Sequence, residues 1–216
     1  DHLFDLIFWI VMTWCVLAEV ILFYFCFRFR KKEGVRGQYV TGEKKHEKKW
    51  ISIPHYLVLF FDVFLIAGAV SVWYNIKQQQ PEAERTIGII AQQWAWTFIH
   101  PGKDGILHTA DDVATVDELH LIENVTYHFE LESRDVLHSF SVPVFRLKQD
   151  TIPGRRITGW FKTQKTGVWD IQCTEICGIG HALMPAKVHI ASAFDHEEWL
   201  NQQTPNVTGT ILASSN

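Results

Sequence analysis

The chain has 216 residues, 47% of them hydrophobic, and its 20 Lys and Arg against 24 Asp and Glu give a formal net charge of −4. This balance excludes a strongly basic nucleic-acid-binding protein, and the length allows one soluble domain of roughly 130 residues plus a separate segment. The averages hide two unlike parts. Residues 1–79 hold nearly all the long apolar runs and carry ten Lys and Arg against seven Asp and Glu, whereas residues 80–216 carry ten against seventeen. We therefore expect an apolar anchor over 1–79 followed by an acidic globular domain over 80–216.

Two apolar runs in the first part have the length of membrane-spanning helices. They extend from Leu3 to Phe27 and from Ile51 to Trp73, and few polar residues interrupt them. Each meets the requirement of ~20 apolar residues for a helix that crosses hydrocarbon. A signal peptide has a shorter apolar core and a small-residue cleavage site, and neither feature is visible here. We predict transmembrane helices over about 3–27 and 51–75.

The connector between the two runs, residues 28–49, is basic. It carries nine Lys and Arg against three Glu. Because positively charged loops are retained on the cytoplasmic side, both ends of the chain and the acidic domain are expected on the outer side of a cell (inner) membrane. This orientation places the domain in the periplasm or outside the cell.

Two carboxylates, Glu19 and Asp62, lie inside the predicted spans. Exposure of either group to lipid is costly, and such residues normally face a partner or a water-filled path. A carboxyl held protonated against a neighbouring helix is the alternative. In both cases two helices cannot shield the groups fully, so we expect a larger membrane partner.

From Arg85 onward, short alternating or apolar segments between turn signals predict an all-β sandwich or barrel. The candidate strands are Thr86–His100, Glu118–Glu123, Thr126–Glu132, Val136–Val142, Arg156–Lys162, Gly167–Gln172 and Pro185–Ile190. A short helix is expected over Asp195–Gln203, with Asp195 as its N-cap and Glu198 completing a capping box. The last dozen residues are rich in Ser, Thr and Asn and predict a loose tail.

Metal-ligand chemistry is concentrated between Cys173 and Met184. This stretch holds two thiols, an imidazole and a thioether within twelve residues, and His138 lies thirty-five residues before Cys173. A disulfide between Cys173 and Cys177 would close a very short loop, which is poor disulfide geometry, so a shared metal is the better interpretation. Soft sulfur ligands with imidazole select copper, whereas a structural zinc site would not use a methionine. A mononuclear blue-copper site needs one cysteine, so the second one points to a binuclear centre; a redox disulfide and a zinc site remain the alternatives.

The same residues carry a resemblance. In type and spacing, and together with the run Asp135–Phe140, they are similar to the CuA motif of cytochrome c oxidase subunit II, and the likeness covers nearly the whole chain, including the two-helix anchor. The motif consists of His138, Cys173, Glu175, Cys177, His181 and Met184.

The resemblance implies a cupredoxin-like Greek-key sandwich after the two-helix hairpin. Cys173 and Cys177 would bridge two copper ions, and His138 and His181 would each bind one of them. Weak ligands would be Met184 to one copper and the backbone carbonyl of Glu175 to the other. The Glu175 side chain would reach a magnesium ion at the interface with subunit I.

Two further roles follow from the resemblance. Trp94, in the run Gln93–Trp96, matches the surface tryptophan through which electrons enter, although a Trp-rich strand is more often core. Glu47 matches the glutamate at the mouth of the proton path called the K channel; the alternative is a solvated loop charge. Ala95 and Arg134 depart from the family pattern, where an aromatic and often an acidic residue stand, so the donor can be a soluble or a tethered cytochrome c.

The loop Pro101–Asp112 has an Asp and Gly spacing vaguely like that of calcium loops, but it does not fit the EF-hand pattern and a plain hairpin connection is favoured.

The resemblance implies an electron-transfer subunit of a respiratory oxidoreductase. Electrons would come from cytochrome c and pass to haem in subunit I, where oxygen is reduced and protons are pumped. The alternatives are a CuA-bearing subunit of a nitric oxide reductase and a copper-free structural subunit of a quinol oxidase. A copper chaperone fits least, because delivery needs an exposed, labile site.

Overall fold

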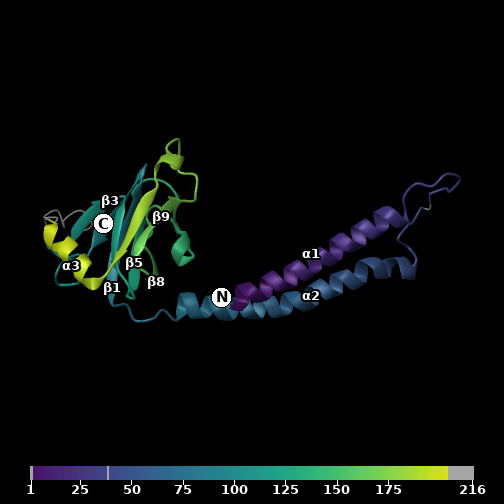
Figure 1. The fold of residues 1–216 in the computed structure, drawn as a ribbon, viewed down its shortest axis with the longest axis horizontal. Coiled ribbons are helices and arrows are strands. Elements are labelled where there is room, and N and C mark those ends of the chain that lie inside the picture. The colour runs from purple at the N-terminus through teal and green to yellow at the C-terminus, as the bar shows by residue number, and fades with distance from the viewer. Residues whose placement is uncertain (1, 38, 204–216) are drawn as a thin grey trace. The chain divides into compact units, whose positions relative to one another are not determined.

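The computed structural model describes residues 2–37 and 39–203, and the chain divides after Gln79 into two compact units. The predicted C-terminal tail lies outside the described residues. In chain order the first unit holds two long helices, and the second holds the strands and one further short helix (Figure 1).

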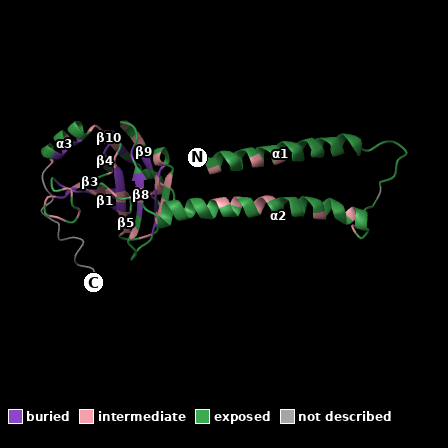
Figure 2. Cartoon of the chain, turned by 90° about the horizontal axis from the view of Figure 1, so that it is seen from below, coloured by how far each residue is buried: buried purple, intermediate pink, exposed green. Residues whose placement is uncertain are grey.

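The first unit is a pair of helices, α1 (His2–Arg28) and α2 (Lys45–Trp73), and α2 continues as a π-helical turn over Tyr74–Gln78. Both helices are long and apolar enough to span a membrane. The described residues of both helices are exposed or half-buried, as Figure 2 shows, so the helix pair does not bury its own apolar surface. The rings of Trp14 and Phe61 meet edge to face at 5.8 Å between the two helices.

The second helix begins at Lys45, whereas the apolar pattern placed its start near residue 51. Glu47 explains the difference. Its carboxylate accepts hydrogen bonds from the backbone N–H groups of Gly42 (3.0 Å) and Lys44 (3.4 Å), which satisfies donors at the helix start. Hydrophobic patterning finds the membrane-spanning part of a helix and misses a polar first turn.

The second unit is a sandwich of two five-stranded sheets, with strand orders β3-β2-β1-β5-β8 and β4-β10-β9-β6-β7. The strands are β1 (Arg85–Gln92), β2 (Ala95–His100), β3 (Val113–Val116), β4 (Glu118–Ile122), β5 (Thr126–Ser133), β6 (His138–Val142), β7 (Leu147–Thr151), β8 (Ile157–Lys162), β9 (Gly167–Cys173) and β10 (Ala186–Ala191). A short helix, α3 (Ala193–Gln202), follows β10. The predicted fold class, a two-helix hairpin followed by an all-β sandwich, is confirmed.

The core lies between the two sheets, and the buried residues gather along the strands (Figure 2). β2 shows the pattern clearly, since Trp96, Phe98 and His100 are buried and the residues between them are half-buried. Phe140 of β6 lies edge-on to Trp96 at 5.4 Å and to Phe98 at 6.3 Å, so aromatic rings from both sheets close the centre. This packing holds the first residue of β6, His138, fully buried.

The structure differs from the expected strands at one place that matters for function. The single strand expected over Thr86–His100 is two strands, because the chain reverses at Gln93–Trp94 and β2 pairs antiparallel with β1. The Gln93 N–H donates to Asp135 Oδ2 at 2.7 Å and the Trp96 N–H to Asp117 Oδ1 at 2.8 Å. Distant carboxylates thus support a turn that has no Gly, Asn or Pro to announce it.

Three smaller differences are local. The strands β3 and β7 had no counterpart among the expected strands. The helix α3 starts before Asp195 and is capped by Ser192, whose Oγ accepts from the Asp195 N–H at 3.1 Å. Asp195 therefore occupies the third position of the helix, and its carboxylate accepts from the Ser192 hydroxyl at 2.8 Å.

Candidate metal centre

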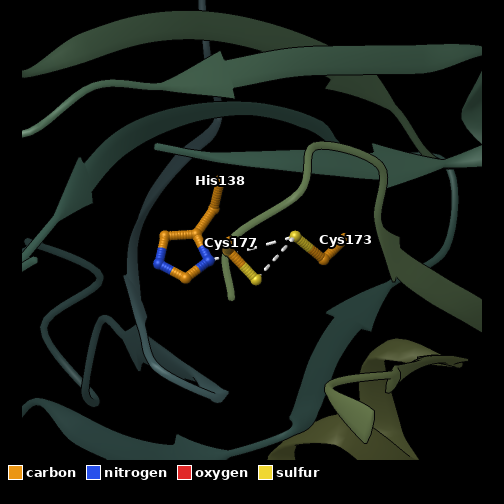
Figure 3. Close-up of side chains that lie close together, drawn as sticks. All are labelled: His138, Cys173 and Cys177. Atoms are coloured by element: carbon orange, nitrogen blue, oxygen red, sulfur yellow. Dashed lines mark hydrogen bonds between the residues drawn. The ribbon is translucent and has the colours of Figure 1, made fainter. Parts of the chain in front are cut away.

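Three segments bring the sulfur and imidazole side chains together. Cys173 is the last residue of β9, His138 is the first residue of β6, and the pairing of Phe140 with Cys173 sets these strands side by side. Cys177, His181 and Met184 follow on the chain between β9 and β10, with His181 in a single 3₁₀ turn. Figure 3 shows His138, Cys173 and Cys177 pointing toward one another.

The donor atoms form two groups that meet at the cysteines. Cys173 Sγ lies 3.9 Å from His138 Nδ1 and 3.3 Å from the Glu175 carbonyl oxygen. Cys177 Sγ lies 3.6 Å from His181 Nδ1 and 3.3 Å from Met184 Sδ. The two sulfur atoms are 3.8 Å apart (Figure 3). Each cysteine therefore has its own imidazole and its own weak third donor.

This donor set fits copper. A sulfur separation of 3.8 Å allows one metal ion to lie about 2.3 Å from both thiolates, the usual metal–sulfur bond length. Thiolate, thioether and imidazole together suit copper and are foreign to hard cations such as Mg²⁺ or Ca²⁺. The two-group arrangement offers a full shell to each of two ions, whereas one tetrahedral ion would leave donors unused.

The ligand residues of this site differ in how far they are buried. His138, Cys177 and Met184 are at most 3% exposed, whereas Cys173 and His181 are half-buried. Burial, the hydrogen bond with Cys173 and that neighbour's charge raise the pKa of the Cys177 thiol to about 11. A metal ion must displace this proton, as it does at any thiolate site.

Asp135 is a supporting residue to which the sequence reasoning gave no role. Its Oδ1 lies 2.9 Å from His138 Nε2, so the carboxylate accepts from the ring nitrogen that faces away from Cys173. Burial would raise the pKa of Asp135, but the hydrogen bonds from His138, Gln93 and Val136 outweigh it and lower the pKa. A carboxylate behind a ligating imidazole fixes its tautomer and orientation. The Asp-x-x-His spacing was the available signal.

Trp94 and Trp96 take different places around the centre. Trp94 lies in the β1–β2 turn with 37% of its surface exposed, and its ring covers Gly178 and Gly180, where an added Cβ would meet the indole. Gly178 also has a φ of +123°, which L side chains rarely adopt. Trp96 is fully buried, and its Nε1–H donates to the Met184 carbonyl at 3.2 Å.

The neighbouring Gln93 joins the same turn to the segment 174–185 between β9 and β10, called here the ligand loop, because the Gln93 Nε2 donates to the Cys177 carbonyl at 2.7 Å. Trp94 thus packs on the chain that carries Cys177 and His181, and it also reaches solvent. Trp94 stands before β2, whereas Trp96 is the second residue of that strand.

Glu47 belongs to the first unit, where it caps α2, and its side chain is 14% exposed. Glu175 stands in the ligand loop between Cys173 and Cys177 with its side chain half-buried. The predicted proton-path and magnesium roles of these two glutamates stay predictions.

The Pro101–Asp112 segment connects the antiparallel strands β2 and β3, as a hairpin connection does. Asp111 Oδ1 accepts from the Thr109 hydroxyl at 2.6 Å, and Asp104 Oδ1 accepts from the Ile106 N–H at 2.8 Å. Among the described residues, the aspartates of this loop do not form a convergent metal-ligand group.

The comparisons with known proteins point to one family. The family described as the periplasmic domain of cytochrome c oxidase subunit II matches residues 85–191. An alternative cytochrome c oxidase subunit 2 from Bradyrhizobium diazoefficiens is 36% identical over 228 residues, covering 94% of this chain and 79% of the relative. Cytochrome c oxidase subunit 2 from Cereibacter sphaeroides is 27% identical, covering 89% of this chain and 72% of the relative.

A solved structure agrees as well. The crystal structure of the periplasmic domain of cytochrome oxidase subunit II from Bradyrhizobium japonicum matches with a TM-score of 0.50 and 28% identity, over 56% of this chain and 94% of that one. The sandwich is therefore cupredoxin-like, as predicted. With two helices able to span a membrane and an outer-side domain, the chain belongs to the cytochrome c oxidase subunit II family, a copper-binding component of an oxidoreductase complex.

Proposed function

We propose that this chain is the electron-accepting subunit of a membrane-bound cytochrome c oxidase, taking electrons from cytochrome c at a two-copper CuA centre and passing them to haem in subunit I. The observation that carries the proposal is the division of the donors into two groups around the paired sulfur atoms of Cys173 and Cys177. Copper, when bound, supplies a one-electron redox couple at this position. Oxygen reduction and proton pumping belong to the partner subunit.

The residues of the chain divide the work of holding the metal ions. Cys173 and Cys177 would hold both ions, and His138 and His181, whose Nδ1 atoms lie beside the two sulfur atoms, would each hold one. Met184 and the Glu175 carbonyl would serve as weak ligands, one to each ion. The buried His138, Cys177 and Met184 exclude water from one side of the site, which would limit solvent reorganisation when an electron is transferred.

Electrons enter through Trp94 in this proposal. Its ring is exposed on one side and packs against the Gly178–Gly180 loop on the other. Three apolar side chains of the same loop are strongly exposed, namely Ile176 (82%), Ile179 (96%) and Leu183 (79%). Exposed apolar residues beside a redox centre suit a transient protein partner. The acidic balance of residues 80–216 favours a donor that carries positive charge.

The membrane side of the proposal concerns subunit I. Glu19 and Asp62 lie within α1 and α2, where carboxylates require a partner or a water path. The Glu175 side chain would contribute to a magnesium site at the interface with subunit I, and Glu47 would stand at the mouth of the K channel. The basic 28–49 connector supports an orientation with both chain ends on the outer side of the cell membrane.

The test is electron uptake by the copper-loaded full-length chain in detergent. Mixed with reduced cytochrome c in a stopped-flow instrument, it should oxidise the donor rapidly, and the copper-free chain should not. The variant Cys177→Ser is the matched control, because a hydroxyl is a poor bridging ligand for copper. Donor oxidation that is equally fast without copper would refute the proposal.

A further inference from the structure

A second cluster of metal-ligand side chains lies on the strands β4 and β10. Glu118 and His120 are two residues apart on β4, so they point to the same face of the sheet. His189 of β10 is the register partner of His120, and partners on adjacent strands also share a face. Sheet pairing therefore places two imidazoles and a carboxylate side by side.

The ligand atoms of these three residues converge. All of them lie within 4.8 Å of one another. His189 Nε2 is hydrogen-bonded to Glu118 Oε2. The rings of His120 and His189 are stacked, with centroids 4.7 Å apart and planes 9° from parallel. The side chains of Glu118 and His189 are 49% and 33% exposed, so an ion can reach them from water.

The helix α3 holds the cluster in place. The Trp199 ring is stacked on His120 at 4.1 Å and 11°, on the opposite side from His189. The edge of the stack is closed by His100, whose ring meets Trp199 at 5.1 Å. His100 Nε2 is itself 3.0 Å from the Thr115 hydroxyl, so this histidine is a packing residue. Trp199 thus fixes the ring of His120, and the part-exposed His189 would have to turn out of the stack for both imidazoles to bind one ion, since a bound ion lies in the plane of each ring.

This cluster is separate from the cysteine centre. Met184 precedes β10, whereas His189 lies three residues past its first residue, Ala186, or about 10 Å further along the strand. The cluster shares no donor with the cysteine centre. The subunit II function assigned above does not use it.

We propose that Glu118, His120 and His189 form a second metal site, which binds a divalent transition-metal ion of the zinc class. Two imidazoles and one carboxylate, with no thiolate, suit a borderline ion such as Zn²⁺, and the exposed side leaves room for a water ligand. An ion bound there would take the place of the hydrogen bond between His189 and Glu118 and tie the edge strand β4 to β10.

Zinc titration of the copper-loaded full-length chain in detergent tests this proposal. With the cysteine centre filled, calorimetry should detect one further Zn²⁺ per chain. The variants His120→Gln and His189→Gln should each weaken this binding by at least about 100-fold, because a lost ligand matters more than the supporting contacts whose loss costs 10–100-fold. Co²⁺ in place of Zn²⁺ should give visible absorption bands that the same variants lose.

The matched control is His108→Gln. His108 pairs with Glu130 at 2.8 Å, a contact of the same kind without a second histidine, so its loss should leave zinc binding unchanged. The copper absorption checks the fold of every variant. If His120→Gln does not fold, the variant of the half-exposed His189 decides the test. No additional zinc in the parent chain, or equal zinc affinity in His189→Gln and the parent, would overturn the proposal.

Discussion

Replacement of Trp94 by Phe separates the proposed electron-transfer role of this residue from its part in the fold. The indole bridges solvent and the ligand loop, since it is 37% exposed and covers Gly178 and Gly180. A phenyl ring keeps some of this contact but shortens the reach of the aromatic system. We expect copper binding to be normal and electron uptake from reduced cytochrome c to slow by more than about 100-fold, equivalent to about 2.7 kcal/mol in activation free energy.

The comparison residue is Trp96, because its surroundings predict a larger loss of stability and a smaller loss of electron-uptake rate. Trp94→Phe removes part of a partly exposed ring and should cost about 1 kcal/mol or less in the free energy of unfolding. Trp96→Phe removes a fully buried ring's hydrogen bond to the Met184 carbonyl and part of its packing, for a total of about 2–3 kcal/mol. Trp96→Phe should therefore be the less stable variant and Trp94→Phe the slower one.

Two measurements decide between the residues. Stopped-flow oxidation of the donor, at several donor concentrations, separates the rate of electron uptake from donor affinity. Urea unfolding of the same copper-loaded chains gives the stability difference. Equal and small rate effects in both variants would refute the reasoning, and so would a slow Trp94→Phe variant whose copper content had fallen.

Three further predictions concern groups around the centre, in the first unit and in the core. Asp135→Asn should weaken copper binding by about 10–100-fold in competition dialysis, because the carboxylate orients His138; unchanged affinity would contradict this. In the assembled oxidase, Glu47→Gln should slow oxygen turnover while leaving copper content and the oxidation of cytochrome c by the copper centre unchanged; normal turnover would leave Glu47 with its capping role alone. Stability should fall as the pH drops from about 6.5 toward 3, because burial and the charges of His120 and His196 lower the pKa of His100 to about 3 and unfolding takes up a proton. His100→Gln should flatten this slope by up to about 1.4 kcal/mol per pH unit in urea unfolding, and an identical slope in both chains would count against the assignment.

The fold class and the positions of most strands could be predicted from the sequence because their signals are local. Alternation in the segment that became β5 and the long apolar runs of α1 and α2 depend only on neighbouring residues. The reversal at Gln93–Trp94 could not be predicted in this way. It depends on the Asp135 carboxylate, forty-two residues away in sequence, and no turn-forming residue marks it.

The residues of the candidate site also divide into those with a local sequence signal and those that depend on distant contacts. Cys173, Cys177, His181 and Met184 lie close together in sequence, so their chemistry is visible as a motif. The pairing of β6 with β9, which brings His138 to Cys173, is a long-range contact that only the family resemblance made available in advance.

The cluster of Glu118, His120 and His189 had no signal in the sequence at all. The two histidines lie sixty-nine positions apart, and each is an unremarkable residue in an alternating segment. Only the parallel pairing of β4 with β10 and the packing of α3 bring them together.

The copper stoichiometry of the purified full-length chain tests the binuclear assignment most directly. After loading with copper and removal of the excess, metal analysis should find two copper ions per chain, with the purple, mixed-valence spectrum of a delocalised pair. Cys177→Ser should lose this spectrum, since Cys177 Sγ lies next to the donor atoms of Cys173, His181 and Met184. One copper ion per chain, or zinc at full occupancy of the cysteine site, would contradict the assignment.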